Sequence, residues 1–155
     1  MKFLDLPART GERFCLAMDV AKNESDLALL RQHGWEVADP ITVSADANSY
    51  RDFIRGSKGE FTVAKDLNVR LRTGWFSDRG ACYLAAGRPV INQETGFDTL
   101  VPPGSGLYGF RSLEEAADAF MRVRDDYPAR CASARRLATD HFAADVVLRD
   151  LVARL

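Results

Sequence analysis

The sequence has few of the residues that build metal centres and disulfide frameworks. Its 155 residues include three cysteines and two histidines. Cys15, Cys82 and Cys131 lie far apart, so they form neither a CxxC metal clip nor a disulfide framework. Neither His33 nor His141 has a cysteine or carboxylate partner at the spacing of a zinc site. We therefore expect no bound metal and a reducing, cytoplasmic compartment.

Long apolar runs and an excess of one charge are also missing. No run of about 18 apolar residues occurs and no signal-peptide core follows Met1, so we expect neither a transmembrane segment nor a secretion signal. The 21 basic and 22 acidic residues give a net charge of −1, which argues against a nucleic-acid-binding protein. With 46% hydrophobic residues the chain is typical of a globular protein, and we expect a single domain over residues 1–155.

Short β-like runs alternate with helix-like runs. Strands are expected at residues 13–18, 35–38, 61–64 and 88–91, and helices at residues 24–33, 46–57 and 77–86. Ser112 and Glu115 form a capping box at the start of a helical tail, which Pro128 divides. Such alternation is typical of βαβ units. We therefore predict an α/β fold: a Rossmann-like, three-layer parallel sheet with helices on both faces and a helical C-terminal tail.

The loop before the helix at residues 77–86 is chemically unusual. Residues 51–88 carry eight basic and four acidic side chains, a local charge of +4, which favours an anionic ligand in this part of the chain. Gly74 permits a tight turn or a close backbone approach, and Ser77 is a typical N-cap. A helix start with free N–H groups and the positive end of the helix dipole suits a phosphate.

Two arginines and a glycine near this helix start leave two interpretations open. Arg72 and Arg79 would supply paired positive charge to an anion, with Gly80 keeping the first turn free of side chains. Alternatively, the residues form a capped helix whose glycine packs against Trp75, and the arginines are solvated.

Two further glycine-containing loops follow, at residues 92–97 and 102–107. In parallel sheets, ligands bind at the carboxyl ends of the strands. We expect the loop at 92–97 to lie beside the loop at 72–80 at that edge, and the three loops together to form the rim of a ligand site.

The motifs of this region resemble those of a known family. They are GWFSDR at 74–79, AGRPVI at 86–91, ETGF at 94–97 and SLEEA at 112–116. Together they are similar to the C-terminal, nucleotide-sugar-binding half of bacterial GT-B glycosyltransferases, and the resemblance covers nearly the whole chain.

The resemblance implies a donor site. In the family, two Rossmann-like domains face each other across a cleft, and the C-terminal domain holds the nucleotide sugar. At the matching positions, the amides of Ser77 and Asp78 would face the diphosphate, and Thr95 and Gly96 would line the sugar or phosphate side. Helix-terminal amides and arginine would stabilise the departing diphosphate without a metal or other cofactor. The candidate donor-binding residues are Arg72, Gly74, Ser77, Asp78, Arg79, Glu94, Thr95 and Gly96; no catalytic residue is assigned.

The chain departs from the family pattern at two points. Many retaining members have two glutamates near this helix, one of which holds the ribose, but the matching positions here are Gly74 and Cys82. Ribose binding by that route is therefore not expected, and Glu94 is considered as a substitute. The histidine-containing signature of the inverting plant-type enzymes is not met. Cys82 is expected to pack as a small buried hydrophobe, and both histidines to lie at helix ends.

The length matches one half of such an enzyme. We expect a truncated C-terminal portion that lacks its first βα unit and the N-terminal acceptor domain, and that does not transfer sugar alone. The alternative is a non-catalytic α/β module that self-associates or docks a partner through its exposed edge. A third interpretation, a flavodoxin-like or dinucleotide-binding domain, is weakened because no GxGxxG follows the first strand.

Overall fold

The structure, a computed structural model, describes residues 2–19 and 23–155. The chain divides into two compact units, residues 1–53 and 54–155. The boundary lies within helix α4 (Ala47–Gly56). The fold is α/β, with short parallel strands in two small sheets. In the described part of the chain, no helix is both long enough and apolar enough to cross a membrane.

The first unit contains one βαβ motif. Its elements are α1 (Leu6–Thr10), β1 (Phe14–Ala17), α2 (Glu24–Gln32), β2 (Trp35–Ala38) and α3 (Pro40–Val43), followed by most of α4. Strands β1 and β2 pair in parallel with Phe14 opposite Trp35, and the two ring centroids are 4.8 Å apart. The indole N–H of Trp35 donates to the carbonyl of Leu4 at 2.8 Å. This aromatic pair therefore forms the core of the small sheet.

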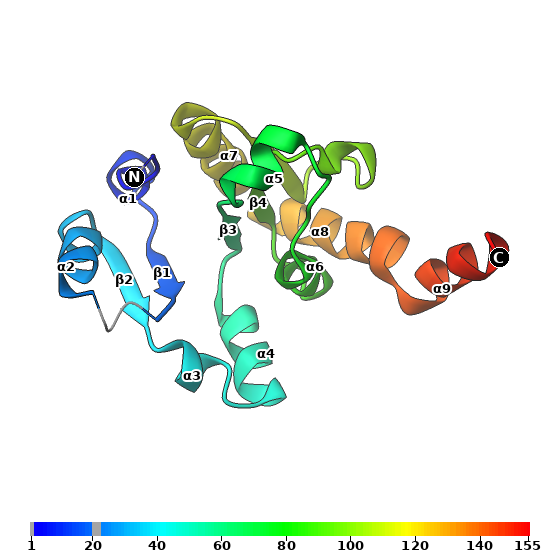
Figure 1. The fold of residues 1–155 in the computed structure, drawn as a ribbon, viewed down its shortest axis with the longest axis horizontal. Helices are drawn as coiled ribbons and strands as arrows, with labels where there is room; N and C mark the ends of the chain where they lie inside the picture. Colours follow the sequence, from blue (N-terminus) through cyan, green and yellow to red (C-terminus); the bar gives the residue numbers. More distant parts are fainter. Residues whose placement is uncertain (1, 20–22) are drawn as a thin grey trace. The chain divides into compact units, whose positions relative to one another are not determined.

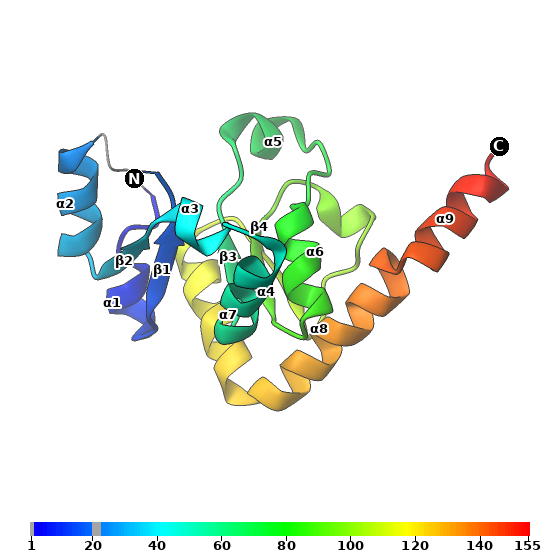
Figure 2. The ribbon, with the colours of Figure 1, turned by 90° about the horizontal axis from the view of Figure 1, so that it is seen from below.

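The second unit contains the three-stranded sheet (Figures 1 and 2). Its elements are β3 (Glu60–Thr62), α5 (Asp66–Leu71), α6 (Asp78–Ala85), β4 (Val90–Gln93), the 3₁₀ helix η1 (Phe97–Thr99), β5 (Leu107–Phe110), α7 (Leu113–Asp125), α8 (Tyr127–Phe142) and α9 (Ala144–Ala153). The strands are parallel in the order β3–β4–β5, and every residue of the central strand β4 is buried. An uninterrupted buried strand is typical of a parallel sheet covered on both sides.

Alternate side chains of β3 show which helix lies on which face. Phe61 stacks on Phe110 of β5 and lies against Phe120 of α7, so α7 covers this face. Glu60 and Thr62 point to the opposite face, where both contact Arg79 of α6. Helix α8 packs on α6. The carboxyl ends of β3 and β4 therefore lie close to the start of α6.

Most of the predicted elements are confirmed, with shifted ends. The four predicted strands correspond to β1–β4, Ser77 caps α6, and Gly87 ends that helix with a φ of +69°. Ser112 and Glu115 cap α7 as expected, and Pro128 lies in the first turn of α8. The strands form two sheets instead of the single sheet that was predicted.

The predicted ligand rim is wrong in its third loop. A fifth strand, β5, begins at Leu107, and the carbonyl of Gly106 accepts a hydrogen bond from Val90 at the start of β4. The loop at 102–107 therefore ends at the amino edge of this parallel sheet, opposite the carboxyl edge where β4 runs into the loop at 94–97. Gly106 lies directly against the backbone of Ala134 in α8, which accounts for the glycine without a ligand.

Candidate functional site

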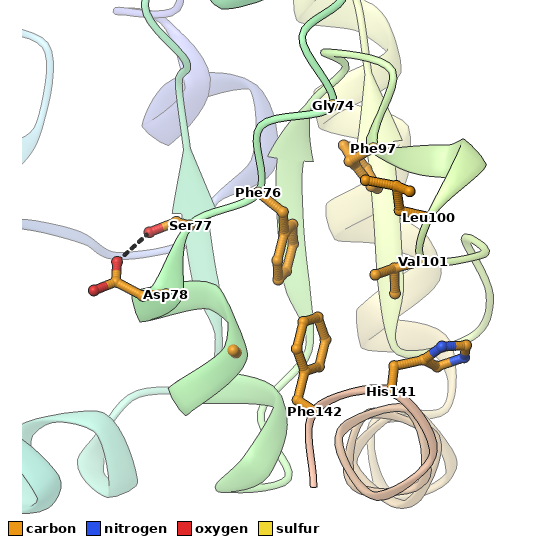
Figure 3. Close-up of a pocket in the computed structure, with 10 residues that line it drawn as sticks. Gly74, Phe76, Ser77, Asp78, Phe97, Leu100, Val101, His141 and Phe142 are labelled. Atoms are coloured by element: carbon orange, nitrogen blue, oxygen red, sulfur yellow. Dashed lines mark hydrogen bonds between the residues drawn. The ribbon is translucent and has the colours of Figure 1, made fainter. Parts of the chain in front are cut away.

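The second unit has an open pocket of about 550 Å³ at the start of α6 (Figure 3). The loop before α6, its first turns, the segment from η1 onward and the end of α8 form its walls. The lining residues are Gly74, Phe76, Ser77, Asp78, Ala81, Phe97, Leu100, Val101, His141 and Phe142.

Three phenylalanines form the apolar part of the pocket. The ring of Phe76 stacks on Phe142 with a centroid distance of 5.6 Å and lies 5.7 Å from Phe97. Figure 3 shows the rings of Phe76 and Phe142 facing each other, while Ser77 and Asp78 point away from them. The pocket therefore has an apolar part and a separate polar part, as do most small-molecule sites.

The polar part is the N-terminus of α6. Ser77 is buried, and its Oγ accepts a hydrogen bond from the backbone N–H of Arg79 at 3.2 Å. The same N–H donates to Oδ1 of Asp78 at 2.9 Å. Among the described residues, the N–H groups of Asp78 and Gly80 have no acceptor. The carboxylate of Asp78 thus lies at the helix start, and the N–H groups of Asp78 and Gly80 there remain without an acceptor among the described residues.

The loop before α6 and the loop after β4 are joined by hydrogen bonds, as the sequence predicted for their positions. The N–H of Gly74, whose φ is +76°, donates to the carbonyl of Thr95 at 2.9 Å. The hydroxyl of Thr95 donates to the carbonyl of Trp75 at 2.6 Å. Thr95 is fully buried, and its bond to Trp75 is partly buried. The backbone that leads into the pocket is held by a neighbouring strand end.

Arg72 stabilises the same junction but does not line the pocket. It has a left-handed backbone conformation with a φ of +48°, and its Nη2 lies 3.8 Å from Oδ1 of Asp98. A Cβ on Gly96 would come within 3.1 Å of the Arg72 carbonyl. Gly96, with a φ of +91°, is therefore required both for its conformation and for this close approach.

Glu94 is buried and shapes the turn after β4. Its Oε1 accepts a hydrogen bond from the N–H of Gly96 at 2.7 Å. A Cβ on Gly109 of β5 would lie 2.8 Å from the Glu94 Oε2. The carboxylate therefore lies under the sheet edge and is not among the pocket residues.

A buried polar cluster around Glu60 that the sequence did not predict lies beneath the first turn of α6. Oε1 of Glu60 accepts hydrogen bonds from Arg79 Nε at 2.5 Å and from the Thr62 hydroxyl at 2.7 Å. Among the described residues, Oε2 of Glu60 and Oδ1 of fully buried Asn92 have no hydrogen-bond partner. A Cβ on Gly80 would come within 2.9 Å of the Phe76 ring and 3.3 Å of Glu60, so this glycine packs against Phe76, not Trp75.

The structure thus separates the predicted donor-binding residues into two groups. Gly74, Ser77 and Asp78 line the pocket. The others support it from outside: they are Arg72, Arg79, Glu94, Thr95 and Gly96. Arg79 is held by Glu60, which was not among the residues predicted from the sequence.

The cysteines and histidines give no further site. Cys82 is exposed, which corrects the expectation that it is buried, because it lies on the outer side of α6. His33 follows α2 and its Nδ1 lies 2.9 Å from Asp5, and His141 is in the last turn of α8. Within residues 2–19 and 23–155, no three of the His, Cys, Asp and Glu side chains are grouped so that they could hold a metal ion.

Comparisons of the chain with models of protein families, with curated proteins and with solved structures gave no match. The interpretation of the pocket therefore depends on its own geometry and on the motifs.

Proposed function

We propose that residues 54–155 form a Rossmann-like, three-layer domain that binds the diphosphate of a nucleotide sugar at the start of α6. The sheet with α6 and α8 on one face and α7 on the other is consistent with this fold. The resemblance to the donor-binding half of GT-B glycosyltransferases supplies the ligand class.

The observation that carries the proposal is the pair of hydrogen bonds that joins Gly74 and Trp75 to Thr95 beside the pocket. They fix the loop that leads into the helix start, where the N–H groups of Asp78 and Gly80 have no acceptor among the described residues. A diphosphate fits the positive end of the α6 dipole and these donors. Arg72 and Arg79 lie before and after this loop in the chain, and each is paired with a carboxylate, Asp98 and Glu60, so they support the helix start from outside the pocket.

The carboxylate of Asp78 has a defined place in this proposal. It accepts the hydrogen bond from Arg79 N–H that an anionic ligand would also use. We expect a bound diphosphate to displace this carboxylate by rotation of the Asp78 side chain. Asp78 therefore takes part through its backbone amide, and its side chain competes with the ligand. On the family resemblance, a separate domain holds the acceptor, so we expect donor binding without sugar transfer by this chain alone.

Titration of the ¹⁵N-labelled chain with UDP, GDP and dTDP tests the proposal. At least one diphosphate should shift the amide resonances of Ser77, Asp78, Gly80 and Gly96. Uridine, which has no phosphate, should not shift those of Ser77, Asp78 or Gly80. Arg72→Ala should weaken binding, and Arg70→Ala, an exposed arginine paired with Asp66 on α5, should not. If none of the three nucleotides shifts the amide resonances around Ser77, the proposal is wrong.

A further inference from the structure

Helix α9 has an apolar face that the described residues leave uncovered. Val147, Leu148, Leu151 and Val152 are 47%, 57%, 55% and 68% exposed, and their spacing places them on one side of the helix. The opposite side is polar, with ion pairs between Arg149 and Asp145 and between Arg154 and Asp150. The helix is thus amphipathic, and its apolar side faces solvent.

The pocket also has an exposed apolar side chain of its own. Leu100 lines the pocket and is 69% exposed, and its side chain lies next to Gly74. Leu71, at the end of α5, is 67% exposed and precedes Arg72, which pairs with Asp98 beside Leu100. Leu100 thus offers an exposed apolar contact at the pocket.

A single residue separates the pocket wall from α9. Helix α8 ends at Phe142, whose ring stacks on Phe76 inside the pocket, and α9 begins at Ala144. The residue between them, Ala143, is extended (φ −64°, ψ 136°) and provides no side-chain cap for α9. Figures 1 and 2 show α9 leading away from the sheet beyond this joint. The apolar face of α9 is therefore tethered directly beside the apolar mouth of the pocket.

We propose that α9 is a lid, and that rotation of its backbone about Ala143 places its apolar stripe on Leu100 and over the mouth of the pocket. The occupant of this surface is α9 of the same chain, because the interface would continue the existing contact of Phe142 with Phe76. A tether of one residue gives the two surfaces a high effective concentration, and their burial supplies the driving force. The ion pairs on the opposite side of α9 stay in water when the lid closes. The inference does not depend on which ligand the pocket binds.

Distance measurements between two spin labels test the lid. Cys15, Cys82 and Cys131 are replaced by serine in the full chain, and labels are attached through Thr99→Cys, next to Leu100, and Ala153→Cys, outside the stripe on α9. Ten helical residues make a lever of about 15 Å, so rotation by a right angle moves its tip by about 20 Å. We expect two populations, the second one shorter by about that distance. A single long distance at all temperatures and salt concentrations would overturn the lid.

Two variants and a dilution make the test specific. Leu148→Ser with Leu151→Ser should remove the short distance, whereas Arg149→Ser with Asp150→Ser, which changes the other side of the same helix, should keep it. Circular dichroism checks that each variant retains its helices. A short distance that survives in the leucine variant shows that the stripe does not drive closure, and overturns the proposal. So does a short distance that disappears on dilution with unlabelled protein, because α9 then binds a second copy.

Discussion

The hydroxyl of Thr95 and the carbonyl of Trp75 form a hydrogen bond of 2.6 Å between two loops that are twenty residues apart in sequence. Thr95 is fully buried, and its own carbonyl accepts the N–H of Gly74. One residue at the end of β4 thus determines the path of the backbone into α6. The geometry of the candidate site therefore depends in part on an uncharged residue.

Replacing Thr95 with valine should destabilise the second unit by about 1–3 kcal/mol, because the Trp75 carbonyl loses its donor and valine keeps nearly the same shape. Urea unfolding, followed by circular dichroism, measures the change. Thr95→Ser keeps the hydroxyl and loses one methyl group, so it should be less damaging than valine. If serine proves as harmful as valine, packing and not the hydrogen bond accounts for the loss.

The ion pair of Glu60 and Arg79 should be strongly coupled. Glu60 is buried and Arg79 is half-exposed, so Arg79→Ala leaves a buried carboxylate with the Thr62 hydroxyl as its remaining partner. We expect a loss of about 2 kcal/mol, less than for a pair that is buried on both sides. In a Glu60→Gln background the same arginine substitution should cost at least about 1 kcal/mol less. Equal costs in both backgrounds, measured by urea unfolding, would show that the pair is not coupled.

Replacing either of two glycines of one loop with alanine should change stability by different amounts. A Cβ on Gly106 would overlap the backbone of Ala134, whereas a Cβ on Gly104 meets no atom within 4 Å. We expect Gly106→Ala to destabilise the chain by about 1–3 kcal/mol and Gly104→Ala to change its stability by less than about 0.5 kcal/mol. The melting temperatures of the two variants test this. Similar melting temperatures would contradict the packing of this loop on α8.

The features that were predicted correctly from the sequence are local. The N-cap at Ser77, the glycine stop at Gly87 and the capping box at Ser112 each depend on a few neighbouring residues, and all are present in the structure. The neighbouring positions of the loops at 72–77 and 94–97 follow from parallel strands that end at one edge.

The features that the sequence did not predict depend on residues far apart in the chain. Strand β5 has four residues, one of them Gly109, and follows a run of glycines and prolines that is typical of a loop. Gly109 is present because Glu94 packs against it. Arg79 was expected to be available to an anion, but Glu60, nineteen residues earlier, holds it. No periodicity or motif reports such tertiary pairs.

Asp46 should contribute to the acid sensitivity of the first unit. Hydrogen bonds from the N–H groups of Ser49 and Asn48 at the start of α4 lower the pKa of the Asp46 carboxyl. Because the pKa of Asp46 is lowered in the folded state, its carboxylate contributes fully to stability above the ordinary pKa of about 4. This contribution is lost as the pH falls through the lowered pKa of the folded state.

The matched variant for this prediction is Asp46→Ser, which keeps an N-cap acceptor that does not titrate. The difference in melting temperature between wild type and variant should stay constant above about pH 5 and shrink toward pH 2. Asp46→Ala should be less stable than both at neutral pH. A wild-type advantage over serine that stays the same down to pH 2 would show that this carboxylate does not supply the acid dependence.

Asp78→Asn should strengthen nucleotide binding if the proposed function is correct. The substitution removes a negative charge from the N-terminus of α6, where the carboxylate accepts a hydrogen bond from Arg79 N–H and competes with a diphosphate. A charge at this position interacts with the helix dipole by up to about 1 kcal/mol, so we expect the affinity for UDP, GDP or dTDP to rise about two- to five-fold. Asp118→Asn, which removes an exposed charge from α7, controls for net charge and should leave the affinity unchanged. Calorimetric titration at low and moderate salt compares the three proteins, and the gain should shrink at higher salt because ions screen the repulsion. Weaker binding by Asp78→Asn would mean that the carboxylate itself holds the ligand, and a diphosphate would then be the wrong chemistry for this pocket.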